Sequence, residues 1–325
     1  MLRPLKTLAL AAALSLTAMG ATAQTYPTRP VSIVVPFAAG GPTDTVARSV
    51  AAGMEKVLGQ AVIVENRPGA GGTIGADSVA KAAPDGYRLL VWHIGMSTSP
   101  ALYRRLPFDP MKDFAHIGLI NDVPMTLMVR PSLEVQNLGQ LVSWAKTNAD
   151  KATLANAGLG AASHLCGLLF QQAIGTQLIT VPYKGTAPAL ADLIGNQVDI
   201  LCDQTTNTTP HIKAGKLRAL ALTAPSRLES LPDVPTATEA GLKGFELGIW
   251  HGLYAPKGTP QPVVDRLVAA LQQALASPEI GKRFADLGSV IYPVAQQTPE
   301  GLRTHLKSEI DKWGPVIRSA GVYAD

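Results

Sequence analysis

The pattern of apolar and polar residues begins with a strand that leads through a loop of small residues into a helix. Val31 to Val35 is rich in β-branched residues, which is the composition of a buried strand. Small residues occupy 38–41, and apolar residues then recur at helical spacing from Val46 to Val57. Thr43 or Asp44 is the expected N-cap. The loop is either an ordinary connection or an anion site, because unpaired N–H groups and the positive end of the helix dipole meet there.

Short apolar strands and helical patterns continue to alternate along the chain, and this alternation predicts an α/β fold. The further predicted strands are 61–65, 87–92, 117–120, 125–129, 152–157, 178–181, 198–202 and 213–223. The further predicted helices are 74–82, 138–147, 165–174, 187–194, 262–276 and 299–320.

A second small-residue loop, 158–164, repeats the opening architecture of strand, glycine loop and helix. It nearly matches a dinucleotide fingerprint, with Ser163 in place of the third glycine, but that motif needs an acidic residue about twenty positions later. No Asp or Glu lies between Lys151 and Ala191, so the dinucleotide interpretation is rejected. The sequence therefore predicts two α/β lobes whose loops face each other across a cleft and hold an anion from both sides.

Polar residues that follow predicted strands are further candidates for the cleft, because ligands of open α/β sheets bind beyond the carboxyl ends of strands. His93 and Ser97 follow the strand 87–92, and Asp203 follows the strand 198–202. Each has a structural alternative. A lone histidine is more often structural, and Asp203 could cap the next turn instead of facing the cleft.

The composition of the chain argues against nucleic acid as a partner. The chain has 325 residues, of which 46% are hydrophobic, 16% charged and only 5% aromatic, and these values favour buried cores over a stacking surface for nucleic acid. The formal charge is +4, and without Arg3 and Lys6 the 28 basic residues fall to 26 against 24 acidic ones, or +2. No concentrated basic patch is present, so no nucleic-acid partner is expected.

The first 23 residues have the pattern of a cleavable signal peptide. Arg3 and Lys6 precede an apolar stretch from Thr7 to Ala18, and the run 21–23 is an A-x-A cleavage site. The mature chain would start at Gln24. We therefore expect a soluble, exported protein, most naturally in a periplasm.

Cys166 and Cys202 are the two cysteines of the chain. An exported protein permits a disulfide between them, and the alternative is two buried thiols that behave as small hydrophobic residues. No Cys-His cluster has the spacing of metal ligands, so neither a metal nor another cofactor is expected.

Several motifs together resemble the Bug family of periplasmic solute-binding receptors, the binding components of tripartite tricarboxylate transporters. They are PFAAGGPTD, ENRPGAGGTIGAD, APDGY, LPFDPMKDF, ASHLCG, VPYKGTAPALADLIGNQVD, HIKAGKLRALALT, LPDVPTATEAG and YAPKGTP, in this order. The resemblance implies a two-lobed, type II periplasmic-binding-protein fold without catalytic activity. Lobe 1 would comprise 24–122 and the return segment 222–325, and lobe 2 would comprise 123–221.

The resemblance also implies a small carboxylate as ligand, membrane transporter subunits as partners, and a monomer. It places the ligand between the loops 37–44 and 158–163, with an acidic residue, here Asp203, near the cleft. The candidate ligand-binding residues are thus Phe37, Ala38, Ala39, Gly41, Thr43, Asp44, His93, Ser97, Gly160, Ala161, Ala162, Ser163 and Asp203. Many relatives carry a hydroxyl residue where this chain has Ala161 and Ala162, which predicts a less polar pocket and mildly favours a ligand with an apolar or aromatic body.

The alternative function is a secreted serine hydrolase that uses Ser163 or Ser97. Such an enzyme needs a serine held by a base that a third group orients. Ser163 precedes His164 directly, and adjacent residues of a helix do not face each other. No G-x-S-x-G motif is present. We therefore favour a binding protein over an enzyme.

Overall fold

The computed structural model describes residues 26–319, 321, 323 and 324. The expected signal peptide, 1–23, lies outside the described residues. Within the described part of the chain, no helix has the length and apolar character needed to cross a membrane.

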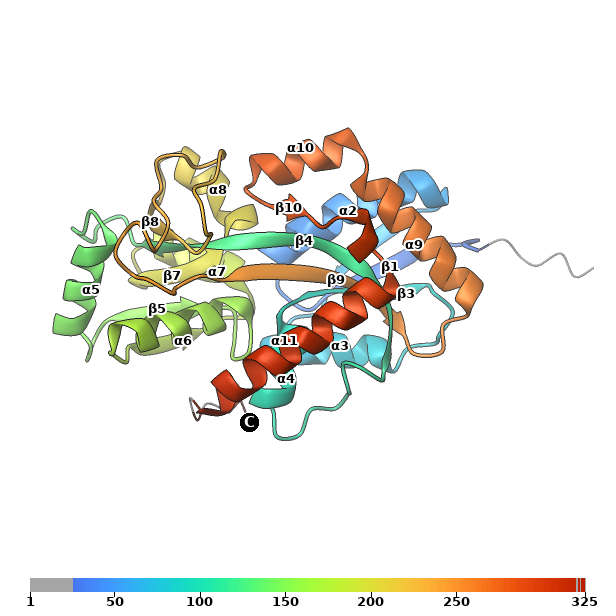
Figure 1. The fold of residues 1–325 in the computed structure, drawn as a ribbon, viewed down its shortest axis with the longest axis horizontal. Coiled ribbons are helices and arrows are strands. Elements are labelled where there is room, and N and C mark those ends of the chain that lie inside the picture. Colours follow the sequence, from blue (N-terminus) through green and yellow to red (C-terminus); the bar gives the residue numbers. More distant parts are fainter. Residues whose placement is uncertain (1–25, 320, 322, 325) are drawn as a thin grey trace, which may run out of the picture.

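The described chain forms the α/β architecture that the sequence predicts (Figure 1). The strands are β1 (Val31–Val35), β2 (Val62–Asn66), β3 (Arg88–His93), β4 (Phe114–Val129), β5 (Thr153–Asn156), β6 (Ile179–Pro182), β7 (Ile200–Gln204), β8 (Arg218–Leu222), β9 (Gly248–Pro256) and β10 (Val290–Ile291). The α-helices are α2 (Pro42–Leu58), α3 (Thr73–Ala80), α4 (Gly95–Leu102), α5 (Leu138–Thr147), α6 (Ala162–Ile174), α7 (Thr186–Ile194), α8 (Thr205–Lys213), α9 (Gln261–Leu275), α10 (Pro278–Asp286) and α11 (Pro299–Ser319).

The strands follow the order β2-β1-β3-β9-β4-β7-β5-β6, with β8 and β10 beside β4. The strands β2, β1 and β3 are parallel in one half of the molecule, and β6, β5 and β7 are parallel in the other. The long antiparallel strands β4 and β9 lie side by side across the middle and join the two lobes (Figure 1). The fold is therefore two-lobed.

The strand β4 corrects one prediction, because the expected strands 117–120 and 125–129 are a single strand of 16 residues. The polar residues Asn121 and Asp122 do not interrupt it. Asp122 pairs with Trp250 of β9 after a register shift between Leu119 and Asp122, and the buried Asn121 side chain donates to Ser289 Oγ at 2.7 Å. A polar residue that finds a hydrogen-bond partner can remain inside a sheet.

Helix boundaries differ from the predictions at both small-residue loops. The N-cap of α2 is Gly41, not Thr43 or Asp44, because Pro42 occupies the first helical position, where its missing N–H costs nothing. The helix α6 begins at Ala162 and not at Leu165, so that Ser163 lies in its first turn. The helices α4, α8 and α10 were not predicted. The expected strand 213–223 is shorter in the structure, because α8 ends at Lys213 and a turn precedes β8.

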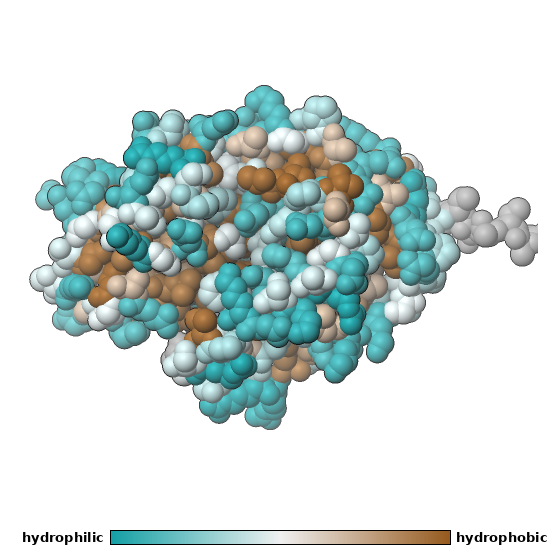
Figure 2. All heavy atoms as spheres, viewed as in Figure 1, coloured by the Kyte–Doolittle hydropathy of each residue, from teal (hydrophilic) through white to brown (hydrophobic). Residues whose placement is uncertain are grey.

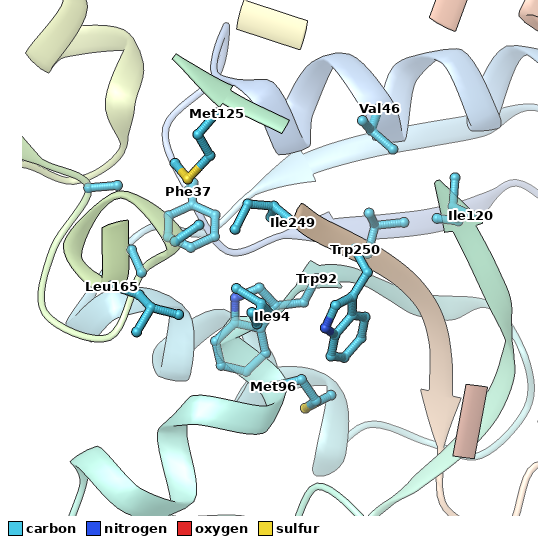
Figure 3. Close-up of a cluster of buried hydrophobic side chains, with 14 of the residues drawn as sticks. Phe37, Val46, Trp92, Ile94, Met96, Ile120, Met125, Leu165, Ile249 and Trp250 are labelled. Carbon is cyan, nitrogen blue, oxygen red and sulfur yellow. The ribbon is translucent and has the colours of Figure 1, made fainter. Parts of the chain in front are cut away.

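One hydrophobic core extends through both lobes. Figure 3 shows part of this cluster, with Phe37 after β1, Trp92 in β3 and Trp250 in β9, and with Leu165 on the facing helix α6. The face shown in Figure 2 carries polar residues over much of its area, with apolar residues gathered in several patches among them. The burial thus concentrates between the sheet and its helices and reaches the junction of the lobes.

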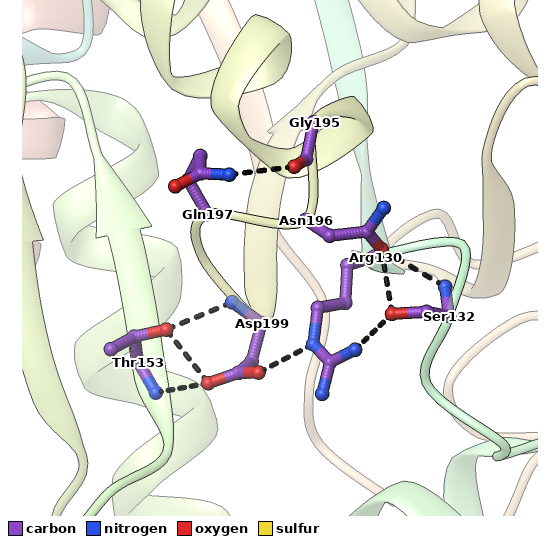
Figure 4. A network of polar contacts seen from close by, with 7 residues as sticks. All are labelled: Arg130, Ser132, Thr153, Gly195, Asn196, Gln197 and Asp199. Carbon is purple, nitrogen blue, oxygen red and sulfur yellow. Dashed lines mark hydrogen bonds and ion pairs between the residues drawn. The ribbon is translucent and has the colours of Figure 1, made fainter.

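A polar network fixes the strands of the second lobe (Figure 4). The Asp199 carboxylate accepts hydrogen bonds from Arg130 Nε at 2.7 Å and from the backbone N–H and hydroxyl of Thr153 at 2.9 and 2.8 Å. Burial alone would raise the pKa of Asp199, but these donors lower it. The network ties the end of β4 to β5 and β7, and so holds the strands from which the second loop and Asp203 project.

Candidate functional site

A small buried cavity lies where the two lobes meet. With about 10 Å³ of space, it has room for roughly one water molecule. Its lining comes from both lobes and consists of Phe37, Gly41, Pro42, Thr43, His93, Ala157, Ala162, Ser163, Thr186, Asp203 and Gln204. Among these lining residues there is no lysine or arginine, so the donors that face the cavity are hydroxyl, amide and backbone N–H groups.

The lobes touch each other around this cavity. The backbone N–H of Ala38 donates to the carbonyl of Lys184 at 2.9 Å, and Thr98 Oγ1 donates to the carbonyl of Gly160 at 3.2 Å. Each of these bonds joins a residue that precedes the crossing strand β4 to one that follows it. The structure therefore has the cleft closed over the cavity.

The first loop is held in shape by Asp44. Its carboxylate accepts from the backbone N–H of Gly40 at 3.0 Å, from Asn66 Nδ2 at 2.9 Å and from Arg48 Nε at 2.8 Å. Burial opposes ionisation, but the bonds from Arg48, Gly40 and Asn66 outweigh it and lower the pKa of Asp44. Because Asp44 is not among the lining residues, its contribution is to position the loop whose backbone faces the cavity.

Aromatic and imidazole rings form the wall next to this loop. Phe37 stacks on His93 with a centroid distance of 4.8 Å, and Thr43 Oγ1 lies 3.3 Å from His251 Nε2. His93 Nδ1 accepts from the backbone N–H of Gly95 at 2.9 Å, which leaves the proton of the neutral ring on Nε2. Burial lowers the pKa of His93 to about 3 and the pKa of His251 well below its usual range, so both rings are neutral near pH 7.

The second loop presents the N-terminus of α6. Gly158 and Gly160 adopt positive φ values of 104° and 84°, a backbone conformation that suits glycine, and Ala161 is the N-cap. Ser163 Oγ accepts from the backbone N–H of Ala157 at 2.7 Å, so its own hydrogen remains available to another acceptor. The N–H groups of the first helical turn have no partner within the helix.

The third side of the cavity is built by Asp203, Gln204 and Thr186. Asp203 Oδ2 accepts from Asn207 Nδ2 at 2.6 Å, and burial raises the pKa of the Asp203 carboxyl to about 7. Asp203 Oδ1, Gln204 Oε1 and Thr186 Oγ1 are buried and have no hydrogen-bond partner among the described residues. Buried polar atoms are usually paired, so atoms without a partner that line one cavity indicate a place for a polar ligand.

The sequence-derived candidates divide into two groups. Phe37, Gly41, Thr43, His93, Ala162, Ser163 and Asp203 line the cavity. Ala38, Ala39, Asp44, Ser97, Gly160 and Ala161 do not line it. Ser97, on α4, is buried and donates its hydroxyl to the carbonyl of Ile94 at 2.8 Å, so its hydrogen is already used within its own segment.

Sequence reasoning missed Pro42, Ala157, Thr186 and Gln204. Thr186 starts α7, and the run Tyr183-Lys184-Gly185 between β6 and α7 is a third strand-to-helix junction that could have signalled it. Gln204 is the last residue of β7, directly after Asp203.

Neither candidate serine has the surroundings of a nucleophile. Ser163 and Ser97 form hydrogen bonds with backbone groups, and no histidine is paired with either in the described part of the molecule. His164 Nδ1 instead accepts from the backbone N–H of Gly160 at 3.4 Å. The geometry offers no support for the hydrolase alternative.

Cys166 and Cys202 form a disulfide with a Cα–Cα distance of 6.1 Å. The bridge joins α6, which carries Ser163, to β7, which carries Asp203. It therefore fixes two walls of the cavity relative to each other.

A two-lobed fold whose lobes close on a buried polar cavity defines a solute-binding receptor. The family described as "Tripartite tricarboxylate transporter family receptor" matches residues 46–322. The chain therefore belongs to this family, as the resemblance to the Bug receptors predicts.

Solved structures agree with this assignment. The periplasmic binding protein BugD is 53% identical, with a TM-score of 0.90 over 92% of this chain and 99% of that one. MatC from Rhodopseudomonas palustris, determined with bound malate, is 42% identical, with a TM-score of 0.87 over 90% of this chain and 100% of that one. A second R. palustris protein, determined with adipate, is 34% identical, with a TM-score of 0.86 over 92% of this chain and 99% of that one.

Proposed function

We propose that the protein is an extracytoplasmic receptor that captures a small organic acid and delivers it to the membrane subunits of a tripartite tricarboxylate-type transporter. It binds and releases its ligand without chemical conversion. The pattern of the first 23 residues supports export to the periplasm, and membership in the receptor family supports membrane transporter subunits as partners.

One observation carries the proposal: helix N-termini from both lobes meet at the same buried cavity. Gly41, Pro42 and Thr43 bring the start of α2 to it, and Ala162 and Ser163 bring the start of α6. A helix N-terminus offers unpaired N–H groups and a positive dipole end, and two of them can hold a carboxylate without a lysine or arginine.

The size of the cavity implies that binding is coupled to motion of the lobes. A cavity of about 10 Å³ is too small for an organic acid, so the lobes must separate for the ligand to enter and close less tightly around it. A hinge motion about the crossing strands β4 and β9 provides this change.

The relatives suggest probes for the ligand. MatC was determined with malate, and the second R. palustris protein with adipate, both of which are dicarboxylates. The stacked rings of Phe37 and His93 form part of the wall and can pack against the apolar body of a ligand. Aromatic acids therefore belong in the same panel.

A thermal-shift titration of the chain from Gln24 to Asp325 tests the proposal. The protein is first unfolded and refolded to remove any ligand that copurifies. Malate, adipate and aromatic carboxylates are then added, with the fully methyl-esterified form of each acid as a matched uncharged control. At a hundredfold excess over the dissociation constant, we expect about 2.7 kcal/mol of stabilisation by at least one acid. The same stabilisation by the ester, or no stabilisation by any acid, would contradict the proposal.

A further inference from the structure

A carboxyl group of the protein lines the cavity in which the proposed function places the ligand carboxylate. Asp203 is only 1% exposed, and its Oδ1 atom is buried without a hydrogen-bond partner in the described part of the structure. Its other oxygen, Oδ2, is occupied by the Asn207 amide at 2.6 Å. The unpaired oxygen is therefore the part of Asp203 that can respond to a ligand.

No cation stands between this carboxyl group and an incoming anion. The described residues that line the cavity include neither lysine nor arginine. Lys184 lines an adjoining outer groove of about 570 Å³, which shares Phe37 and Ala157 with the cavity, and Arg48 is paired with Asp44 at 2.8 Å. Two carboxylates that meet in a buried site without a cation strongly disfavour ionisation of both, and such pairs share a proton.

The elements packed against β7 present uncharged groups to Asp203. Thr126 of β4 is its partner in the register and donates its hydroxyl to the Asp203 carbonyl at 3.1 Å. Asn207 of α8 donates to the carboxylate, and Ser163 of α6 lines the same cavity. Burial has the largest effect on the pKa of the Asp203 carboxyl and raises it, although the backbone N–H of Gln204 and the Thr186 hydroxyl of α7 also act on this carboxyl and lower its pKa.

Among Asp203, Asp44 and the histidines around the cavity, only Asp203 changes its protonation state near pH 7. Burial lowers the pKa of His93 to about 3, that of His164 to about 4 and that of His251 well below its usual range, so these rings stay neutral. Asp44 stays ionised because its donors lower its pKa. Burial raises the pKa of Asp203 to about 7, so its proton is exchanged in the physiological range.

We propose that Asp203 is protonated in the liganded receptor and donates this proton from Oδ1 in a hydrogen bond to a carboxylate oxygen of the ligand. Binding of a fully ionised acid is then accompanied by uptake of a proton from solvent. This inference rests on the proposed function, since it specifies how the same site accepts an anion.

The sign of the pH dependence follows from this linkage. The liganded state holds the proton more tightly than the free receptor, so affinity is greatest where Asp203 is already protonated. As pH rises above the pKa of Asp203 in the free receptor, the dissociation constant grows by up to about tenfold per pH unit.

Isothermal titration calorimetry with malate and with adipate tests the inference. Titrations run from about pH 6.5 to about pH 8.5, where both ligand carboxylates are ionised, in buffers of different ionisation enthalpy. We expect weaker binding at the higher pH, together with uptake that approaches one proton per ligand. Asp203→Asn keeps a donor at this position, so it should bind with a nearly pH-independent dissociation constant and no proton uptake.

Asp122→Asn is the matched control, because Asp122 is another carboxyl whose pKa burial raises, and it is not among the lining residues. This variant should retain the pH dependence and proton uptake of the unmodified protein. The proton count of the unmodified protein tests the inference even if Asp203→Asn fails to fold.

Two outcomes would overturn the inference while leaving the proposed function intact. One is acid binding that is independent of pH and takes up no proton. The other is binding of malate or adipate that weakens as pH falls toward about 6.5 and is lost in Asp203→Asn, which would show that the site needs Asp203 in its ionised form. Failure of the unmodified protein to bind any acid at any pH would instead contradict the proposed function, and this inference with it.

Discussion

Ser163 shows how one hydroxyl serves both the fold and the site. Its oxygen accepts the backbone N–H of Ala157 at 2.7 Å and so fastens the second loop to the first turn of α6. Its hydrogen is left for an acceptor in the cavity that it lines. By contrast, Ser97 donates its hydroxyl to the Ile94 carbonyl within its own segment.

Ser163→Ala should therefore weaken both ligand binding and folding. The ligand loses a donor, and the buried N–H of Ala157 loses its partner, which costs about 1–3 kcal/mol. For the acid that stabilises the protein best, we expect the dissociation constant to rise about tenfold or more in calorimetry. Ser97→Ala is the control and should bind normally. Equal affinities of Ser163→Ala and the unmodified protein would show that this hydroxyl does not contact the ligand.

At the residue scale, the sequence indicated which residue types come to the cavity more reliably than it indicated where each side chain points. Phe37, Thr43 and Ser163 were predictable because each follows a strand and starts or precedes a helix. Asp44 was expected to face the ligand, but three donors within its own lobe bind its carboxylate. Two of these donors, Arg48 and Gly40, are close in sequence, and the third, Asn66, is not.

At the element scale, strong apolar periodicity was sufficient to predict a helix, and some helices with weak periodicity were missed. The predicted helix 138–147 coincides with α5. The helix α8 was missed because its sequence, TTNTTPHIK, is rich in threonine and asparagine, which have low intrinsic helix propensity. Its first residues are buried between the lobes, so tertiary packing overrides that propensity.

The close approach of two loops gives a prediction about closure. Gly71 has a φ of +60°, and a Cβ atom there would lie 1.9 Å from the backbone oxygen of Leu159 in the other lobe. This oxygen also accepts from the Tyr103 hydroxyl at 3.1 Å, so it cannot easily move aside. Gly71→Ala should keep the lobes from closing fully.

We expect Gly71→Ala to weaken binding of the acid about tenfold or more without any change in the groups that line the cavity. Gly215→Ala is the control, because Gly215 has a similar φ of +67° and open space around it. Both variants should lose about 1–2 kcal/mol of stability from the left-handed backbone, but only Gly71→Ala should lose affinity. Small-angle scattering with ligand should show a larger radius of gyration for this variant. Normal affinity would mean that this contact does not form in the liganded state.

At the scale of the whole molecule, the disulfide that joins two walls of the cavity also stabilises the fold. Cys166 and Cys202 are 36 residues apart, and a bridge of this span contributes about 3–4 kcal/mol in the chain-entropy model. Replacing both cysteines by alanine should lower the free energy of unfolding in urea by about this amount. Reduction of the unmodified protein should have the same effect, and no further effect on the double variant. Unchanged stability in the double variant would contradict this role.

Sequence motifs were enough to predict the two-lobed fold, but not how the lobes meet. The division of the chain at 122/123 falls inside β4, which runs continuously from one lobe to the other. The bond from Ala38 to Lys184 joins loops separated by most of the first segment of lobe 1 and part of lobe 2. Such contacts depend on the hinge angle, which no local pattern records.

The most direct test of the account is a crystal structure of the protein with bound malate. We predict that one malate carboxylate lies between the N-termini of α2 and α6. One of its oxygens should lie about 2.7–3.2 Å from the first-turn N–H groups and from Ser163 Oγ, and its second oxygen should face Asp203. Malate in the outer groove near Lys184, or a carboxylate held by a lysine or arginine side chain, would contradict the account.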